Sequence, residues 1–234
     1  MGSLLLGGVI IVAAIFGSLK TGGSVVYVQG SALEIVLGGT LGLLFILTPN
    51  AVLKNLAESL RGMVVPEPKI MDLQRELTLI SQKKRLPKPS PHPLIRYVSE
   101  LYEQGVDAAL FEELARQKAY ELEAKAVDSI QSLKNLAKYP PALGMTGTVM
   151  GMIGLFAELE SSKNSIGSHL SIAMTATFYG LILSNAVIGP IADRLEVSLS
   201  RTTRINQTIL DIVLLINHNE PQSVIEDELR ARVA

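Results

Sequence analysis

The chain has 234 residues, of which 48% are hydrophobic and 18% charged, and its formal net charge is −1. Soluble domains carry about 25% charged residues, so this composition is short of solvated surface. There is no cysteine, which excludes disulfides, zinc–thiolate centres, iron–sulfur clusters and cysteine nucleophiles. The histidines, His92, His169 and His218, lack metal-ligand spacing, and we expect neither a metal nor a cofactor.

The chain opens with an uncharged apolar run at residues 4–19. This run lacks the basic start and the cleavage pattern of a signal peptide, and a second apolar run follows within about 15 residues. We therefore interpret it as a retained helix rather than a cleaved signal.

Three further apolar runs contain no Asp, Glu, Lys or Arg: residues 35–53, 139–157 and 165–192. A bilayer core needs about 20 apolar residues in a helix. Four buried helices of this length in a soluble protein would need a large polar shell, which this chain lacks. The predicted fold class is an all-α integral membrane protein with four transmembrane helices and a helical cytoplasmic domain.

The basic residues predict the orientation of these helices. Of the 21 Lys and Arg residues, 19 lie either in residues 54–138 or from Arg194 onward. Basic loops stay on the cytoplasmic side, so both termini are expected inside. The predicted domains are transmembrane helices 1 and 2 (residues 1–53), a cytoplasmic helical domain (54–138), transmembrane helices 3 and 4 (139–193) and cytoplasmic C-terminal helices (194–234).

The cytoplasmic part is predicted to be helical apart from one spacer. An amphipathic pattern covers residues 75–85, and from 94 to 138 the apolar spacing again approaches 3.6 residues and leads directly into the third span. The fourth span is expected to continue to about Ile216, with a last helix after Asn219 and Pro221. Between the first two patterns, four prolines impose an extended spacer: Pro87, Pro89, Pro91 and Pro93.

Small and hydroxyl side chains mark the third and fourth spans. Glycines at intervals of three or four residues share one face of the third span, which is typical of helix packing in lipid. They are Gly144, Gly147, Gly151 and Gly154. The hydroxyls are candidates for an ion pathway, although hydroxyls that bond to their own helix are common. They are Thr146, Thr148, Thr175, Thr177 and Ser184.

No carboxylate lies in the third or fourth span. Ionisable side chains inside a membrane mark ion and proton pathways, and His169 is interpreted as interfacial. Pro141 and Pro190 lie near the cytoplasmic ends of these spans, where each frees a backbone carbonyl. If ions cross this bundle, a second chain must supply the ion-binding carboxylate.

Two motifs in adjacent spans carry a family resemblance, PALGM-x-GT-x-x-G and YG-x-x-x-(S/A)N-x-x-x-x-PIAD. They lie within YPPALGMTGTVMGMIGLF at 139–156 and SIAMTATFYGLILSNAVIGPIADRL at 171–195, after TGGS at 21–24 and ALEIVLGGTLG at 32–42. In these motifs the chain resembles the A subunits of bacterial flagellar stators, the MotA and PomA type, within the superfamily of ExbB and TolQ. The two N-terminal spans favour the flagellar branch, because ExbB and TolQ proteins have three spans.

This resemblance implies an ion-driven motor in the bacterial inner membrane that serves motility and chemotaxis. A homopentamer of A-type chains would surround two B-type chains (MotB- or PomB-like), each with one membrane helix and an essential Asp. Ion flow would become torque on a FliG-like rotor protein, and no nucleic acid is implied as a partner.

The resemblance also assigns candidate residues. Pro141 and Pro190 take the positions of two functional prolines, and Thr148 and Thr177 take hydroxyl positions of the ion pathway. Ala176 stands where Na⁺-driven members tend to carry a second Thr, which favours H⁺ over Na⁺, although Thr146 and Thr175 offer further hydroxyls.

The predicted rotor contact departs from the family pattern. Lys83, Lys84 and Arg85 hold the basic position, but LPKPSPHP follows in place of a Gly-rich stretch with a Glu. Charged residues further on are alternative rotor contacts, namely Glu112, Glu113 and Arg116. For most of them a solvated helix face is the simpler interpretation.

Three other functions remain as alternatives. One is a stator of the same superfamily that powers gliding, ExbB/TolQ-like energisation of the outer membrane, or defence. Another is a membrane enzyme, which is disfavoured because the chain has no P-loop, no Gly-x-Ser-x-Gly and no His cluster. The last is a scaffold that moves no ions.

Overall fold

The computed structural model describes residues 6, 7, 9, 10, 13, 17, 29–63, 70–81, 89–159, 166–218 and 220–233. Every element within these residues is a helix, which confirms the predicted all-α class for the described part of the chain. The predicted first span, residues 4–19, lies largely outside it. Contacts divide the chain into two units, one of residues 1–59 and 128–195 and the other of residues 60–127 and 196–234.

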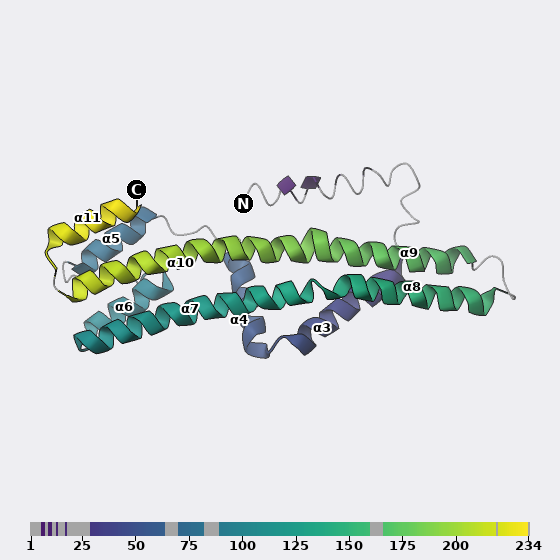
Figure 1. The fold of residues 1–234 in the computed structure, drawn as a ribbon, viewed down its shortest axis with the longest axis horizontal. Helices are drawn as coiled ribbons and strands as arrows, with labels where there is room; N and C mark the ends of the chain where they lie inside the picture. Colours follow the sequence, from purple (N-terminus) through teal and green to yellow (C-terminus); the bar gives the residue numbers. More distant parts are fainter. Residues whose placement is uncertain are drawn as a thin grey trace. The chain divides into compact units, whose positions relative to one another are not determined.

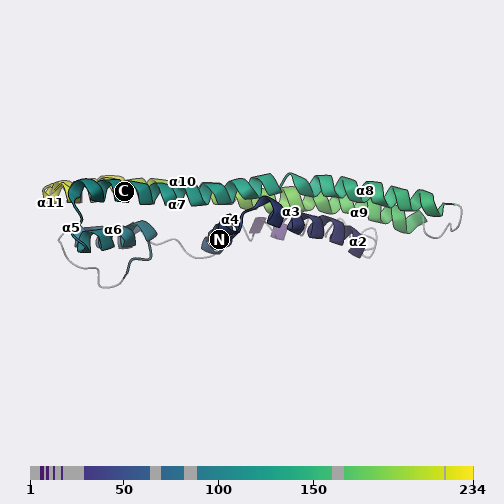
Figure 2. The ribbon, with the colours of Figure 1, turned by 90° about the horizontal axis from the view of Figure 1, so that it is seen from below.

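The first unit is built on two long helices that lie side by side, α8 (Tyr139–Glu158) and α9 (Ile166–Ile182) (Figure 1). α9 continues through a π-helical turn, η3 (Leu183–Ile188), into α10 (Gly189–Asn217). The shorter elements α2 (Gly30–Leu33), η2 (Glu34–Gly38) and α3 (Gly39–Leu47) pack along one side of α8 and α9 (Figure 2).

The predicted second span is shorter than the apolar run suggested. α3 ends at Leu47, Thr48 is extended (φ −112°, ψ 114°), and α4 (Asn50–Gly62) begins after Pro49. A proline ring clashes with the backbone of the preceding residue in the helical conformation, so Pro49 ends α3 at this point. The expectation of one helix over residues 35–53 was therefore wrong at its C-terminal end.

Three helical segments in the described residues are long and apolar enough to cross a membrane: Gly30–Leu47, a part of Ala108–Glu158 and a part of Ile166–Asn217. On α8 the side opposite the glycines is exposed and apolar, with Met145, Val149 and Ile153 at least 58% exposed. Such a surface suits lipid or a partner helix rather than water.

The second unit surrounds a separate apolar core. α5 (Ile70–Ser81), α6 (Pro93–Glu103), α11 (Gln222–Val233) and parts of α7 (Ala108–Leu136) and α10 contribute to it. Its fully buried side chains include Leu94, Ile95, Val98 and Ile212. α6 begins at Pro93, which suits the first turn because an N–H there has no helical partner. α11 begins one residue after Pro221, and Asn219 lies outside the described residues.

The stretch 94–138 is two helices rather than the single one expected. Gly105 has a positive φ of 65° between α6 and α7, a conformation that glycine adopts without steric cost. Asp107 then caps the start of α7, accepting a hydrogen bond from the N–H of Ala109 at 3.3 Å. As predicted, the second helix leads into the apolar segment, since only Ala137 and Lys138 separate α7 from α8.

Candidate functional site: a hydroxyl pair between α8 and α9

Two threonines meet across the interface of α8 and α9. The Oγ1 atoms of Thr148 and Thr177 lie 2.5 Å apart, and either can donate the hydrogen. Two backbone carbonyls complete the site. Thr148 Oγ1 lies 3.0 Å from the carbonyl of Ala173 and 3.1 Å from that of Gly144, and Thr177 Oγ1 lies 3.3 Å from the carbonyl of Gly144.

These contacts make a short chain of hydrogen bonds with two possible directions. The pair has only two hydroxyl hydrogens, and at 2.5 Å one hydroxyl must donate to the other. Either Thr177 donates to Thr148, which donates to a carbonyl, or Thr148 donates to Thr177, which donates to the carbonyl of Gly144. Reversing the chain requires only rotation of the two hydroxyls, so the site has two arrangements of similar geometry.

Close approach of the two backbones brings the threonines into range. A Cβ at Gly144 would lie 2.8 Å from the carbonyl oxygen of Ala176 and 2.9 Å from Cα of Thr177. A Cβ at Gly147 would lie 2.5 Å from Cβ of Ala176, and one at Gly151 would lie 2.8 Å from Cβ of Ala173. Real Cβ atoms do not tolerate such distances, so these glycines set the spacing of α8 and α9.

The other predicted pathway residues do not join the pair. Thr146 lies on the exposed side of α8 and donates to its own helix, to the carbonyl of Ala142 at 3.0 Å. Thr175 is buried on α9 but lies two residues from Thr177, which places it on a different side of the helix. Ala176 is completely buried and clusters with Ala32 and Val36, so this position adds no oxygen to the site.

A second polar contact lies about two to three turns from the hydroxyl pair, at the far end of α8 and α9. His169 Nε2 is 3.2 Å from a carboxylate oxygen of Glu158. Gly154 leaves room for the imidazole, because a Cβ there would lie 2.6 Å from His169 Nδ1. The charge of this pair depends on protonation of His169.

At the other end, the structure reveals a contact that the sequence prediction missed. Ser184 Oγ in η3 donates a hydrogen bond of 2.6 Å to the carbonyl of Ala137, just before α8. Pro141 has no N–H and so leaves this carbonyl without its helical partner. The freed carbonyl was visible in the sequence, but nothing in the sequence indicated that its donor is 47 residues away.

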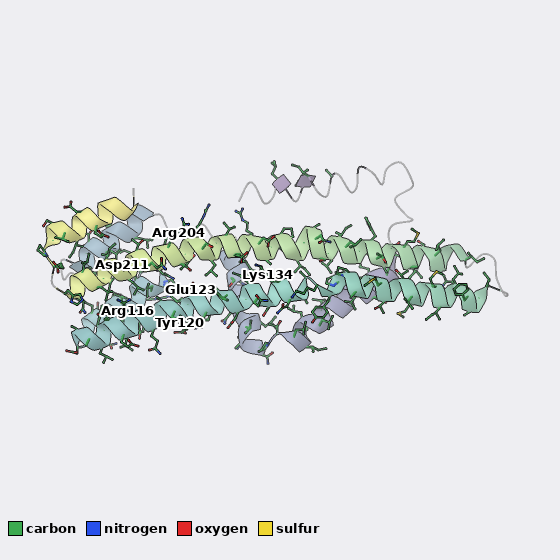
Figure 3. All side chains as sticks on the ribbon, in the orientation of Figure 1. Arg116, Tyr120, Glu123, Lys134, Arg204 and Asp211 are labelled. Carbon is green, nitrogen blue, oxygen red and sulfur yellow. The ribbon has the colours of Figure 1, made fainter. Side chains whose placement is uncertain are left out.

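Three of the charged candidates for rotor contact lie on α7, namely Glu112, Glu113 and Arg116. Figure 3 shows Arg116 on this helix, followed by Tyr120 and Glu123. Arg116 binds Glu112 within its own helix at 2.8 Å, and Glu113 is exposed. Glu121 lies between two lysines: hydrogen bonds from Lys125 and Lys118 lower the pKa of its carboxyl to about 2. All three pairs are between residues on one helix, as expected for a solvated face. Lys83, Lys84 and Arg85 lie outside the described residues.

The helices and the site together define an all-helical membrane protein whose polar centre is a hydroxyl pair between two apolar helices. Residues 88–207, about half of the chain, match the MotA/TolQ/ExbB proton channel family, and the chain belongs to that family. The resemblance found in the sequence is thereby confirmed.

Two curated relatives align with part of the chain. It is 32% identical over 125 residues to Motility protein A of Treponema pallidum, covering 53% of this chain and 48% of the relative. It is 37% identical over 90 residues to chemotaxis protein PomA of Vibrio alginolyticus, covering 38% of this chain and 35% of the relative. The chain thus spans about half or less of these relatives' lengths.

The fold is similar to that of a solved MotAB structure over nearly its whole length. The C. jejuni MotAB structure matches with a TM-score of 0.80 and 17% identity, covering 99% of this chain and 95% of that chain. At this level of identity the match concerns the fold.

Proposed function

We propose that the chain is the A-type subunit of an ion-driven flagellar stator. The observation that carries this proposal is the Thr148–Thr177 pair, a polar site between two helices whose apolar segments contain no carboxylate. Hydroxyls can pass a hydrogen but do not ionise near neutral pH. The pair therefore suits an ion pathway in which another chain carries the ionisable group.

The partner in this proposal is a B-type chain with one membrane helix and an Asp, as in MotB or PomB. Each proton that crosses 100 mV of membrane potential makes about 2.3 kcal/mol available. Protonation removes the charge of the Asp, whose burial in lipid costs several kcal/mol. A protonated Asp passes the hydroxyl pair, releases its proton on the inner side and resets the interface.

The coupling ion in this proposal is H⁺ rather than Na⁺. A dehydrated Na⁺ needs several oxygen ligands, whereas a proton needs one carboxylate and a hydroxyl or water. The oxygens of the pair already bond to one another and to two carbonyls, and Ala176 adds none. Both features favour the proton.

The proposed topology has four transmembrane helices in the inner membrane of a bacterium, with both termini and residues 54–138 in the cytoplasm. The distribution of Lys and Arg supports it. In the assembly, A-type chains form a ring, with five chains as the family implies. The ring turns around a B-type dimer and transfers torque to a FliG-like rotor protein.

The proposal is tested by co-expressing the chain with a B-type partner in cells that lack their own stator. Restored swimming, together with proton uptake into vesicles that is lost when the partner's Asp is replaced by Asn, would support it. Proton uptake without swimming would instead favour a stator of the same family that serves a different system. The unusual LPKPSPHP stretch at 86–93 is the feature that favours this alternative.

A further inference from the structure

The helical hydrogen-bond ladder is interrupted at two neighbouring places, the junction of α7 with α8 and the π-helical turn η3 that joins α9 to α10. On one side, Pro140 and Pro141 follow the turn between α7 and α8, so the carbonyls of Leu136 and Ala137 face no N–H four residues ahead. On the other side, the π-helical turn η3 is followed by Pro190, which also lacks an N–H. Helices bend at prolines and at π-helical turns.

The two interruptions touch each other. A Cβ at Gly180 would collide with the carbonyl of Pro140 and lie 3.2 Å from Cα of Pro141, so α9 passes directly over the prolines. A side-chain hydrogen bond between them joins Ser184, 8% exposed, to the carbonyl of Ala137. The hydroxyl thus takes the place of the N–H that Pro141 lacks.

The spacing from the hydroxyl pair is the same on both helices. Pro141 lies seven residues before Thr148, and Ser184 lies seven residues after Thr177. Seven residues are two helical turns, about 10 Å. A rearrangement at the hydroxyl pair therefore reaches Pro141 and Ser184 over the same number of residues on the two helices.

We propose that the Ser184–Ala137 hydrogen bond is a latch that makes the two hinges bend together. In this role Ser184 is a positioning residue. It touches no ion, and it passes the state of the hydroxyl pair to the helices that continue beyond the hinges. The coupling of this hydrogen bond to rotation rests on the proposed function. Its role in joining the two hinges does not.

The first test uses amide hydrogen exchange of residues 137–145 in the purified full-length chain, with a double-mutant cycle. Ser184→Ala should speed exchange here by roughly tenfold, because it leaves the half-buried carbonyl of Ala137 without its donor. Ser184→Thr should restore slow exchange. Pro141→Ala supplies a backbone N–H to the same carbonyl, so adding Ser184→Ala to it should change exchange less than about twofold.

Ser200→Ala is the matched control, since in the described part of the chain the hydroxyl of Ser200 donates only to the backbone carbonyl of Glu196 in its own helix, at 3.1 Å. The latch would be overturned if Ser184→Ala leaves the exchange rate unchanged. It would also be overturned if Ser184→Ala raises the exchange rate equally in the wild-type and in the Pro141→Ala background. Hydrogen exchange needs neither a partner nor a working motor. It therefore tests the Ser184–Ala137 hydrogen bond even if the wild-type complex moves no protons.

The second test measures rotation against proton flux in the complex with the B-type partner. Ser184→Ala should assemble normally but lower the rotation obtained per unit of proton flux several-fold, and Ser184→Thr should recover it. An unchanged ratio in Ser184→Ala would overturn the coupling role. A wild-type complex without flux or rotation would instead refute the proposed function.

Discussion

Thr148 on α8 and Thr177 on α9 share one hydrogen bond of 2.5 Å, so neither hydroxyl can reorient without the other. The pair is held by glycine contacts on α8 and by the carbonyls of Gly144 and Ala173. This makes the site a rigid frame around two mobile hydrogens, which is the property that the proposed ion pathway needs.

Removing one hydroxyl should break the chain of hydrogen bonds. Thr177→Val keeps the shape of the side chain but leaves Thr148 with no hydroxyl partner. Thr148 keeps the carbonyls of Gly144 and Ala173 as acceptors, so the change removes a net hydrogen bond of about 0.5–1.5 kcal/mol. Placed on the proton-transfer step, this cost lowers proton flux by roughly two- to tenfold. Vesicle proton uptake and swimming speed measure the effect.

Thr40→Val is the control for this variant, because the hydroxyl of Thr40, a buried residue, donates within the described residues only to the carbonyl of Val36 in its own segment, at 2.5 Å. We expect wild-type assembly in both variants and wild-type flux in the control. Normal swimming and flux in Thr177→Val would refute the role of the pair.

A single added methyl group should separate α8 from α9. Gly144→Ala places a Cβ 2.8 Å from a backbone oxygen of α9, so the helices must move apart. Overpacking of this kind costs about 1–3 kcal/mol. Gly42→Ala is the matched change, since a Cβ there meets no atom of the described residues within 4 Å. Thermal unfolding should show a lower midpoint for the first variant only, and equal midpoints would contradict the packing described.

The stability of the second unit should depend on pH through His92. His92 is 7% exposed, and its Nδ1 finds no hydrogen-bond partner among the described residues. Desolvation lowers the pKa of His92 below its usual value near 6.5. The neutral form is therefore favoured in the folded state, and above about pH 6.5 its contribution to stability is complete.

As the pH falls below that value the unfolded chain takes up the proton first, so stability is lost toward the lower, folded-state pKa. The unfolding midpoint of the wild type should fall further between about pH 7.5 and pH 5.5 than that of His92→Gln. Parallel pH curves for the two proteins would show that His92 is not buried in its neutral form.

Replacing Arg116 distinguishes a role in stability from a role in rotor contact. Its ion pair with Glu112 is exposed and lies within one helix, so it adds at most a few tenths of a kcal/mol to stability. Arg116→Ala should leave the unfolding midpoint unchanged. If Arg116 contacts the rotor, swimming speed falls at normal protein levels and normal proton flux. Unchanged swimming would remove Arg116 from the candidates.

The helices and their apolar faces were predictable because they depend on local periodicity. The spacing of Gly144, Gly147 and Gly151 predicted a packing face, and the structure places each of them against α9. The helix ends caused by proline and glycine were predicted less accurately. Pro49 ends α3 inside a run that is otherwise apolar, and Gly105 divides a pattern that looked continuous.

The contacts of the site depend on how two helices are rotated against each other, which spacing within one helix does not reveal. Thr146 and Thr148 are both threonines of the same apolar segment, yet only Thr148 of the two contacts α9. The same limit applies to Ser184, whose acceptor belongs to a different helix. The roles of these residues in ion transfer stay predictions.

The most direct test is a proton-flux measurement on the chain reconstituted in vesicles, alone and with its B-type partner. Because α8 and α9 bring hydroxyls to their interface but no acid, we expect no selective flux from the chain alone. We expect flux when the partner is present, and loss of that flux when the partner's Asp is replaced. Selective proton conduction by the chain without a partner would contradict the proposal that the ionisable group belongs to another chain.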